Sequence, residues 1–397
     1  LLKPQSARLL VGSIRAKYPD LPIHVHSHDT AGIAVASMLA CAEAGADVID
    51  AAIDSMSGLT SQPSMGAVVS SLEQMELGTG ISHENIQRLN LYWSEVRQLY
   101  QCFEQNVKAS DSSVFDHEMP GGQYTNLMFQ SQQLGLGSQW SEIKHAYMEA
   151  NMLCGDIVKV TPSSKVVGDL AQFMVANKLS AKDVEAKASE LDFPVSVIEF
   201  FQGFLGTPPG GFPEPLRSKI IRKKERIDGR RGAQLEPLDF AKIRKDLEQK
   251  FKRPMSECDA VSWAMYPKVF EEFQQFVDEY GDLSRVATRD FLGKPQFNKE
   301  MHVTLQNGKM LIIKLLAVGP LNEETGIREV FFELNGEPRT VEVKDKSADV
   351  KTVAREKASS EPGSVGSPLA GVVVEVRAKE GESVSKGDPL FVMSAMK

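Results

Sequence analysis

Residues 23–53 read IHVHSHDTAGIAVASMLACAEAGADVIDAAI, and this stretch indicates an α/β fold. It opens with Ile23 to His28, a run with β-branched residues that is typical of a short strand. The segment Ala31 to Ala44 is rich in alanine and lacks proline, so it predicts a helix, which Gly45 ends. Asp47 to Ile53 predicts a second, buried strand. The order strand, helix, strand implies parallel strands joined by a helical crossover.

Helices are expected on both sides of this unit, at Gln5 to Lys17 and at Pro63 to Leu77. An α/β barrel is favoured over an open sheet. Because two strands cannot make a barrel of eight, we expect the other strands to precede Leu1. The first residue is not Met and the last, Lys397, lies within a motif, so we expect the chain to be a fragment of a longer protein.

Residues 81–290 have a mostly helical pattern. The helices expected there span residues 86–110, 125–133, 140–153, 166–177, 183–188, 195–201, 240–251 and 266–280. A strand-like run is expected at residues 156–160, and a Gly/Pro loop at 206–215 precedes a basic run at 218–231. This part of the chain is therefore predicted to be a helical layer.

The periodicity changes at Phe297, from which short strands are expected. They span residues 297–305, 310–318, 328–334 and 339–343, with Asn-Gly hairpin turns at 307–308 and 335–336. A charged and then Ser/Pro/Gly-bearing linker is expected at 348–362, followed by strands at 371–377 and 390–393. The sequence thus predicts a small antiparallel β unit and part of a second β domain.

The composition excludes some classes of protein. Lys and Arg number 45 and Asp and Glu number 53, which gives a formal net charge of −8 and argues against a nucleic-acid binder. The four cysteines lie far apart and form no C-x-x-C pair, which favours a reducing compartment over a disulfide scaffold. The most apolar stretch, residues 32–53, contains three acidic residues, so no membrane span is expected.

Three of the seven histidines fall within five residues: His24, His26 and His28. Because side chains alternate along a strand, all three are expected on one face. Two histidines spaced two apart at the end of a barrel strand can share a metal ion, for which neutral imidazole is a common ligand. A solvated histidine stripe is the alternative, and the apolar residues around the stripe argue for burial instead. Asp29 and Thr30 are expected to cap the next helix.

Two further motifs precede predicted helices. Residues 119–126, MPGGQYTN, form a tight turn that could hold an anion in a backbone nest, although a plain loop is favoured. Residues 160–165, VTPSSK, place three hydroxyls and one amine at a junction into a helix. Capping of that helix by Ser163 or Ser164 explains most of this second motif.

The end of the chain carries the sharpest signal. The pattern P-L-A-G at 368–371, G-D-P-L at 387–390 and S-A-M-K at 394–397 is typical of the first half of a biotinyl or lipoyl domain. Lys397 would then stand at a hairpin apex, where a ligase can reach it. Ala-Met-Lys favours biotin over lipoate, and an ordinary surface lysine is the alternative.

Taken together, these motifs resemble the pyruvate carboxylase family over essentially the whole chain. The matching segments are HVHSHDTAG (24–32), DSMSGLTSQPSMGA (54–67), HEMPGGQYTNL (117–127), GDIVKVTPSSKVVGDLAQFMV (155–175), GFPEPLRSK (211–219), VFFELNG (330–336) and VMSAMK (392–397). The resemblance implies the last part of a TIM-barrel carboxyltransferase domain with a helical funnel (1–295), a β-rich tetramerisation or allosteric region (296–358) and half of a biotin carboxyl carrier domain (359–397).

The resemblance also implies roles for individual residues. His26 and His28 would be metal ligands, with Zn or Mn as the metal, and the remaining ligands, an Asp and a carbamylated Lys, would lie upstream of Leu1. His24 has no ligand role and is expected to pack. Thr161 would be the catalytic proton shuttle between pyruvate and biotin, because a hydroxyl can both donate and accept. Ser164 and Lys165 would lie near bound biotin, which is attached covalently at Lys397.

The implied activity is carboxyl transfer from carboxybiotin to pyruvate, which gives oxaloacetate, in a homotetramer that a biotin protein ligase modifies and for which acetyl-CoA is a candidate allosteric activator. The compartment would be the mitochondrial matrix for an animal source and the cytoplasm for a bacterial one. Two alternatives stay open. One is a transcarboxylase or oxaloacetate decarboxylase subunit, although those tend to carry T-P-T-S-Q where this chain has T-P-S-S-K at 161–165. The other is a carrier and oligomerisation fragment without catalysis.

Overall fold

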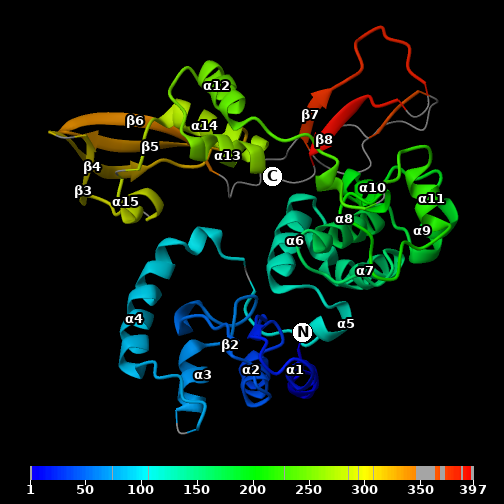
Figure 1. Ribbon diagram of the computed structural model, residues 1–397. Coiled ribbons are helices and arrows are strands. Elements are labelled where there is room, and N and C mark those ends of the chain that lie inside the picture. Colours follow the sequence, from blue (N-terminus) through cyan, green and yellow to red (C-terminus); the bar gives the residue numbers. More distant parts are fainter. Residues whose placement is uncertain are drawn as a thin grey trace. The chain divides into compact units, whose positions relative to one another are not determined.

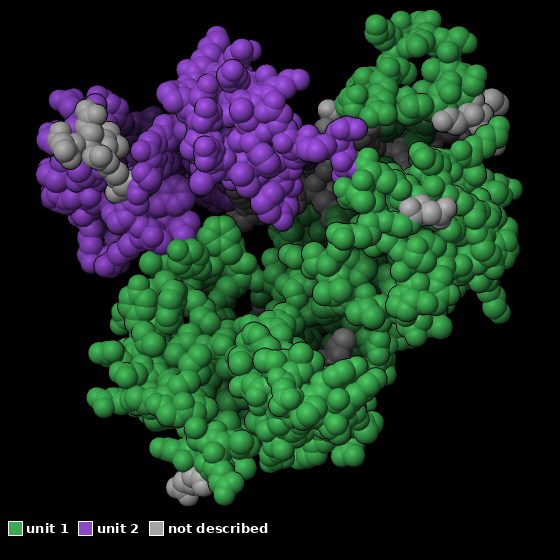
Figure 2. Space-filling view, in the orientation of Figure 1, with its two compact units in different colours: residues 1–234, 358–397 green, residues 235–357 purple. Residues whose placement is uncertain are grey.

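The computed structural model describes residues 2–73, 75–105, 107–227, 229–284, 286–293, 295–306, 308–345, 363–366, 372–385 and 388–394. The chain divides into two compact units, one of residues 1–234 with 358–397 and the other of residues 235–357 (Figure 2). Each unit is considered by itself below.

The first unit begins with alternating helices and strands, as the sequence predicts. Its elements are α1 (Pro4–Lys17), β1 (His24–Val25), α2 (Ala34–Glu43), β2 (Val48–Ile49), a 3₁₀ turn η1 (Asp54–Met56) and α3 (Met65–Leu72) (Figure 1). Strands β1 and β2 are parallel, with His24 opposite Val48. Parallel pairing across a helical crossover is therefore confirmed. Ala7, Val11, Ile23, Ala40 and Cys41 form the small core that joins α1 and α2 to the strands.

Both strands are shorter than expected, and β2 is not buried. Backbone bonds join the two strands from Asp47 N to Ile23 O (2.9 Å) through Asp50 N to Val25 O (3.0 Å). Val48 is 49% exposed, so the prediction of a buried second strand is wrong. The sheet that the described residues form here has two strands, and the face that carries Val48 is open to solvent.

Helices dominate the rest of the first unit. They are α4 (His83–Leu99), η2 (Gln101–Phe103), α5 (Val114–His117), α6 (Gly121–Gln133), η3 (Gly137–Gln139), α7 (Trp140–Leu153), α8 (Ser163–Ala176), α9 (Ala181–Lys187), α10 (Val195–Gln202), α11 (Leu216–Ile221) and η4 (Arg231–Ala233). The bounds of α7 are as predicted. The helix expected over 86–110 ends at Leu99, and the run 156–160, expected as a strand, has no regular structure.

The largest hydrophobic core lies among α6 to α11. Its fully buried members include Leu127, Ile143, Tyr147, Phe173 and Phe201. The long helices α7 and α8 lie against each other at its centre, and a residue larger than glycine at Gly168 would meet the side chains of α6. This core holds the loops that enter α6 and α8, which carry two of the sequence motifs.

The second unit joins helices to an antiparallel sheet. The helices are α12 (Phe240–Phe251), α13 (Glu257–Met265), α14 (Pro267–Tyr280) and α15 (Thr288–Leu292). The sheet runs β3 (Glu300–Gln306), β4 (Lys309–Val318), β5 (Ile327–Leu334) and β6 (Glu337–Lys344) in that order, with every neighbouring pair antiparallel. This confirms the predicted β unit. Asn335 and Gly336 both have positive φ, as a hairpin turn requires, whereas Asn307 of the other expected turn lies outside the described residues.

Near the end of the chain, β7 (Val372–Val376) pairs antiparallel with β8 (Phe391–Ser394). The expected linker at 348–362 and the expected apex at Lys397 lie outside the described residues. None of the helices in the described ranges combines the length and apolar character that crossing a bilayer requires.

Candidate metal and carboxyl-transfer site

The three histidines are placed by β1 and the loop that follows it. His24 belongs to β1, and His26 and His28 follow on the irregular segment after it. Asp50 comes directly after β2, which lies beside β1. Its two carboxylate oxygens lie 2.7 Å from His24 Nε2 and 2.7 Å from His26 Nδ1. The Asp50 carboxylate therefore holds both His24 and His26. The two side chains lie on the same face, as the alternation of side chains along a strand predicts.

His28 is held by the backbone instead. Its Nδ1 lies 2.5 Å from the carbonyl oxygen of Thr60, which can only accept, so Nδ1 carries the proton. The ring packs edge-on against that of His26, with centroids 5.2 Å apart. His26 and His28 thus lie next to each other, and each has its Nδ1 engaged.

This arrangement suits metal ligands. When Nδ1–H of a neutral imidazole donates to a carboxylate or a carbonyl, Nε2 is left with its lone pair free, and metal-bound histidines are usually oriented in this way. Burial lowers the pKa of His28, against the opposing effect of the Thr60 carbonyl, so the ring stays neutral at neutral pH. Hydrogen bonds from His24 and His26 hold the pKa of Asp50 below its ordinary value. The donors present therefore fit a divalent metal.

Two expectations about this cluster need correction. His24 was expected to pack, but its side chain is 60% exposed and bonds Asp50. The apolar neighbours were expected to bury the stripe, but His26 is 56% exposed, because the sheet that the described residues form beside it has two strands. Within the described ranges, no group of three or more His, Cys, Asp or Glu side chains is arranged to hold a metal ion.

The MPGG motif lies directly on this cluster. Helix α6 begins at Gly121, four residues before the expected start, and Pro120 is its N-cap. A Cβ added at Gly121 would lie 2.5 Å from His28 Nδ1 and 2.7 Å from the Thr60 oxygen. Only glycine allows this approach, so the start of α6 closes over the His28–Thr60 bond. The contacts of Asp50 with His26 and of Gly121 with His28 were not predicted, because the two residues of each pair lie far apart in the sequence.

Thr161 lies on the loop before α8, and its side chain is exposed. Neither Ser163 nor Ser164 caps α8, so the capping prediction is wrong. Ser163 is itself the first helical residue, and its Oγ lies 2.6 Å from the carbonyl oxygens of both Val158 and Val160. It therefore fixes the segment that leads to Thr161.

The other two predicted residues follow on α8. Ser164 is buried, at 5% exposure. Lys165 is exposed and its Nζ lies 2.8 Å from Asp169 Oδ2, one turn further along the helix. Asp169 also accepts a hydrogen bond from Ser196 on α10. Thr161, Ser164 and Lys165 thus lie together on the loop before α8 and on its first turn. The hydrogen bond from Ser196 to Asp169 ties this part of α8 to α10.

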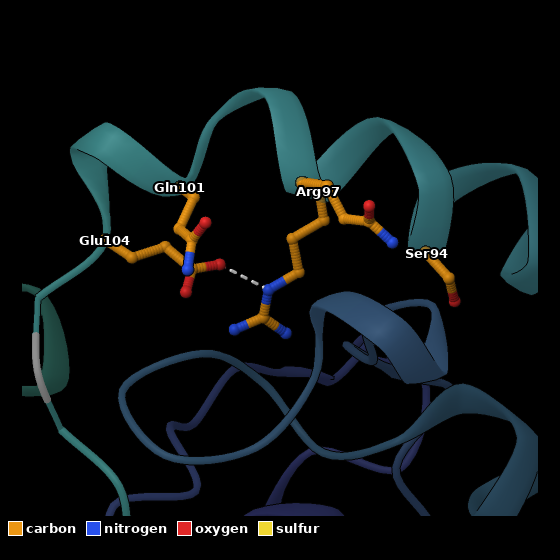
Figure 3. A pocket seen from close by; sticks show the side chains of 5 residues that line it. Ser94, Arg97, Gln101 and Glu104 are labelled. Atoms are coloured by element: carbon orange, nitrogen blue, oxygen red, sulfur yellow. Dashed lines mark hydrogen bonds and ion pairs between the residues drawn. The ribbon is translucent and has the colours of Figure 1, made fainter. Parts of the chain in front are cut away.

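A pocket elsewhere in the first unit contains none of these residues. It is lined by residues of α4, of η2 and of the position after η2: Ser94, Arg97, Gln98, Gln101 and Glu104 (Figure 3). Arg97 Nε pairs with Glu104 at 2.5 Å, and its Nη1 donates to the Ser55 carbonyl, so the charge of the guanidinium is already satisfied. This pocket is a less suitable site than the histidine cluster.

Comparison with known proteins gives matches along the chain. A family described as "Conserved carboxylase domain" matches residues 114–314, just over half of the chain, and one described as "HMGL-like" matches residues 1–91. Proteins named pyruvate carboxylase from Aspergillus terreus and mouse are 59% and 50% identical over the whole chain, which spans 33% and 34% of their length; the mouse protein is named mitochondrial.

Solved structures of a pyruvate carboxylase domain also match this chain. The carboxyl transferase domain of Rhizobium etli pyruvate carboxylase matches with a TM-score of 0.75 at 43% identity, over 87% of this chain and 58% of that one. The same domain solved with pyruvate and biocytin matches with a TM-score of 0.76 over the same shares. The chain spans about a third of the length of the curated relatives that it matches.

Proposed function

The chain belongs to the pyruvate carboxylase family, and from this premise we propose that it provides the histidine ligands, the proton-transferring threonine and the biotin attachment site for moving a carboxyl group from carboxybiotin to pyruvate. The observation that carries the proposal is that the rings of His26 and His28 lie side by side and are both held at Nδ1, by Asp50 and by the Thr60 carbonyl. No hydrogen-bond partner of either Nε2 lies among the described residues.

His26 and His28 would hold the metal, with Zn or Mn proposed, and the other ligands would lie upstream of Leu1. A metal ion bound there supplies Lewis acidity, which favours the enolate form of pyruvate. The residues of this chain contribute orientation. Asp50 and Thr60 set the tautomer of the two rings, and Gly121 allows α6 to pack over them.

Thr161 is proposed to move the proton. Thr161 is exposed on a loop that Ser163 holds in place, so its side chain is accessible to a substrate. A hydroxyl donates and accepts at once, as transfer of a methyl proton from pyruvate to the biotin nitrogen requires. Ser164 and Lys165, in the first turn of α8, would lie near bound biotin, with Lys165 exposed and Ser164 buried. Lys397 would carry biotin covalently.

The wider assignments follow the family. We propose a TIM-barrel carboxyltransferase domain with its helical funnel at 1–295, a tetramerisation or allosteric region at 296–358 and the first half of a carrier domain at 359–397. A homotetramer, modification by a biotin protein ligase and activation by acetyl-CoA belong to the proposal for the whole protein. The compartment would be the mitochondrial matrix for an animal source or the cytoplasm for a bacterial one. The mouse relative named mitochondrial supports the matrix as the compartment for an animal source, and the related domain solved with pyruvate and biocytin supports the assignment of pyruvate and biotin.

The test replaces Thr161 with alanine in the full-length enzyme. Carboxylation of pyruvate should be abolished while biotinylation of Lys397 stays normal. Thr161→Ser, which keeps the hydroxyl, is the matched control and should retain measurable activity. Ordinary oxaloacetate formation by the Thr161→Ala enzyme would refute the proposed role.

A further inference from the structure

An ion pair joins the two loops that carry the site motifs. Lys159 Nζ lies 2.7 Å from Glu118 Oε2, although the two residues are 41 positions apart. Glu118 lies three residues before Gly121, and Lys159 lies two residues before Thr161. The pair therefore bridges the turn that packs on His28 and the loop that presents Thr161.

The lysine of this pair is nearly enclosed. The Lys159 side chain is 8% exposed, whereas that of Glu118 is 52% exposed. Loss of Glu118 would leave the enclosed Lys159 ammonium without its paired carboxylate, which costs more than loss of a partner from a fully exposed pair. Glu118 is the one carboxylate that pairs with Lys159 among the described residues. The enclosed lysine therefore has one carboxylate partner within the described part of the chain, at 2.7 Å.

The backbone on the Glu118 side is held in an unusual conformation. Glu118 has φ 52° and ψ 29°, in the left-handed region that non-glycine residues seldom adopt. Its N–H donates to Val114 O at 2.8 Å, and the next N–H, of Met119, donates to His117 Nδ1 at 3.0 Å. This fixed turn aims the Glu118 carboxylate at Lys159 and leads directly to Gly121.

On the Thr161 side, residues 157–160 lack regular structure, and Val158 and Val160 are 74% and 60% exposed. Ile157 anchors the start of this loop in the largest core, and Ser163 and Lys159 hold the residues that follow. Among the side-chain hydrogen bonds and ion pairs of the described residues, the Lys159 contact joins this loop to the turn over His28.

We propose that Glu118 and Lys159 are positioning residues whose ion pair keeps the Thr161 loop in register with the His28–Gly121 turn. This inference rests on the proposed function. Small displacements of a reacting group cost large factors in rate, about 10²-fold for roughly 1 Å. Loss of the pair should therefore lower the rate of the step that uses Thr161 more than it weakens pyruvate binding.

The experiment uses Glu118→Gln, Lys159→Met and the double variant in the full-length enzyme, with Lys187→Met as the control. Lys187 forms an exposed i,i+4 pair with Asp183 on α9 and should leave every readout unchanged. We expect each single variant to lower kcat about 10- to 100-fold with the pyruvate KM within about twofold. We expect the double variant to be no slower than the worse single variant, because the two side chains act as one contact.

Three readouts separate positioning from a general loss of structure. Bound metal and biotin content should stay at wild-type levels. Hydrogen exchange of residues 157–163 should increase in both single variants. Lys159→Arg, which keeps the positive charge, should retain much of the wild-type kcat. The charge exchange Glu118→Lys/Lys159→Glu should recover much of the kcat that the single variants lose. Because Glu118 is half exposed, Glu118→Gln keeps the test decisive if Lys159→Met does not fold.

Wild-type kcat in Glu118→Gln, or losses that multiply in the double variant, would overturn the inference. If Thr161→Ala is inactive but the pair variants are fully active, the positioning role alone fails. If Thr161→Ala is active, the proposed function fails, and the exchange of residues 157–163 still tests the contact.

Discussion

The carboxylate of Asp50 lies 2.7 Å from Nδ1 of His26. The same carboxylate holds His24 with its other oxygen, and its pKa is lowered by both contacts, so it stays ionised and accepts from each ring. Asp50 is thus placed to fix the His26 tautomer with Nε2 free, the form that a metal ligand needs.

Asp50→Asn should therefore weaken metal binding by about 10- to 100-fold, the usual cost of losing such an outer partner. An asparagine amide can donate to Nδ1 and so favour the opposite tautomer, with the proton on Nε2. The measurement is metal content and metal affinity of the purified full-length enzyme. His24→Gln, which removes the exposed neighbour but not a proposed ligand, should change the affinity far less. Equal metal content in Asp50→Asn and wild type would contradict the prediction.

Gly121→Ala should disturb His28. The added methyl group would lie 2.5 Å from His28 Nδ1 and 2.7 Å from the Thr60 carbonyl, so either the ring or the start of α6 must move. We expect reduced metal content and a fall in activity of about tenfold or more in the full-length enzyme. Gly122→Ala is the matched control, because nothing lies within 4 Å of a Cβ at that position. If the Gly121→Ala enzyme were as active and contained as much metal as Gly122→Ala, the close approach of Gly121 to His28 would not be needed for function.

The elements with strong periodicity were predictable from sequence. The bounds of α7 and α12 agree with the helical pattern, and the four-stranded sheet follows from alternation and an Asn-Gly turn. Helix α13 was missed, although Ser256 and Asp259 form a capping box at its start that is readable in the sequence. Helix α6 was expected to begin late, because two glycines at its start lower helix propensity.

The site was only partly predictable. His26 and His28 stand out through their spacing, but Asp50 and Gly121 reach them from positions 24 and more residues away. Local patterns do not encode such distant contacts. The same holds for Ser163, whose hydroxyl was expected to cap a helix and instead bonds backbone carbonyls of the preceding loop, because the helix begins at Ser163 itself.

Lys397→Arg should abolish biotinylation while keeping the positive charge of the unmodified lysine. Biotin attachment requires the primary amine of lysine, which the guanidinium of arginine does not offer. The measurement is streptavidin detection of the full-length enzyme after expression with a biotin protein ligase. Lys379→Arg, in the described turn after β7, is the control and should keep the signal. A persisting signal in Lys397→Arg would place the biotin elsewhere.

The buried His117 should make the first unit sensitive to mild acid. It is 3% exposed, its Nδ1 accepts from Met119 N–H, and burial, with nearby Lys144, lowers its pKa to about 4. Asp111 and Asp116 oppose this shift without reversing it. Because the pKa in the folded state lies below the ordinary 6.5, the folded state binds fewer protons than the unfolded state. The stability contribution is therefore complete above the unfolded pKa and declines as the pH falls from 6.5 toward about 4.

The urea midpoint of the chain should accordingly drop between about pH 7.5 and about pH 5, and His117→Gln should show a smaller drop because glutamine does not titrate. His145→Gln is the matched control, since the His145 side chain on α7 is 69% exposed and should leave the wild-type drop unchanged. An equal drop in all three proteins would mean that other groups set the acid sensitivity. Because Met119 N–H bonds the ring of His117, the same protonation should loosen the turn that leads through Glu118 to Gly121, and hydrogen exchange of residues 117–121 should increase over the same pH range.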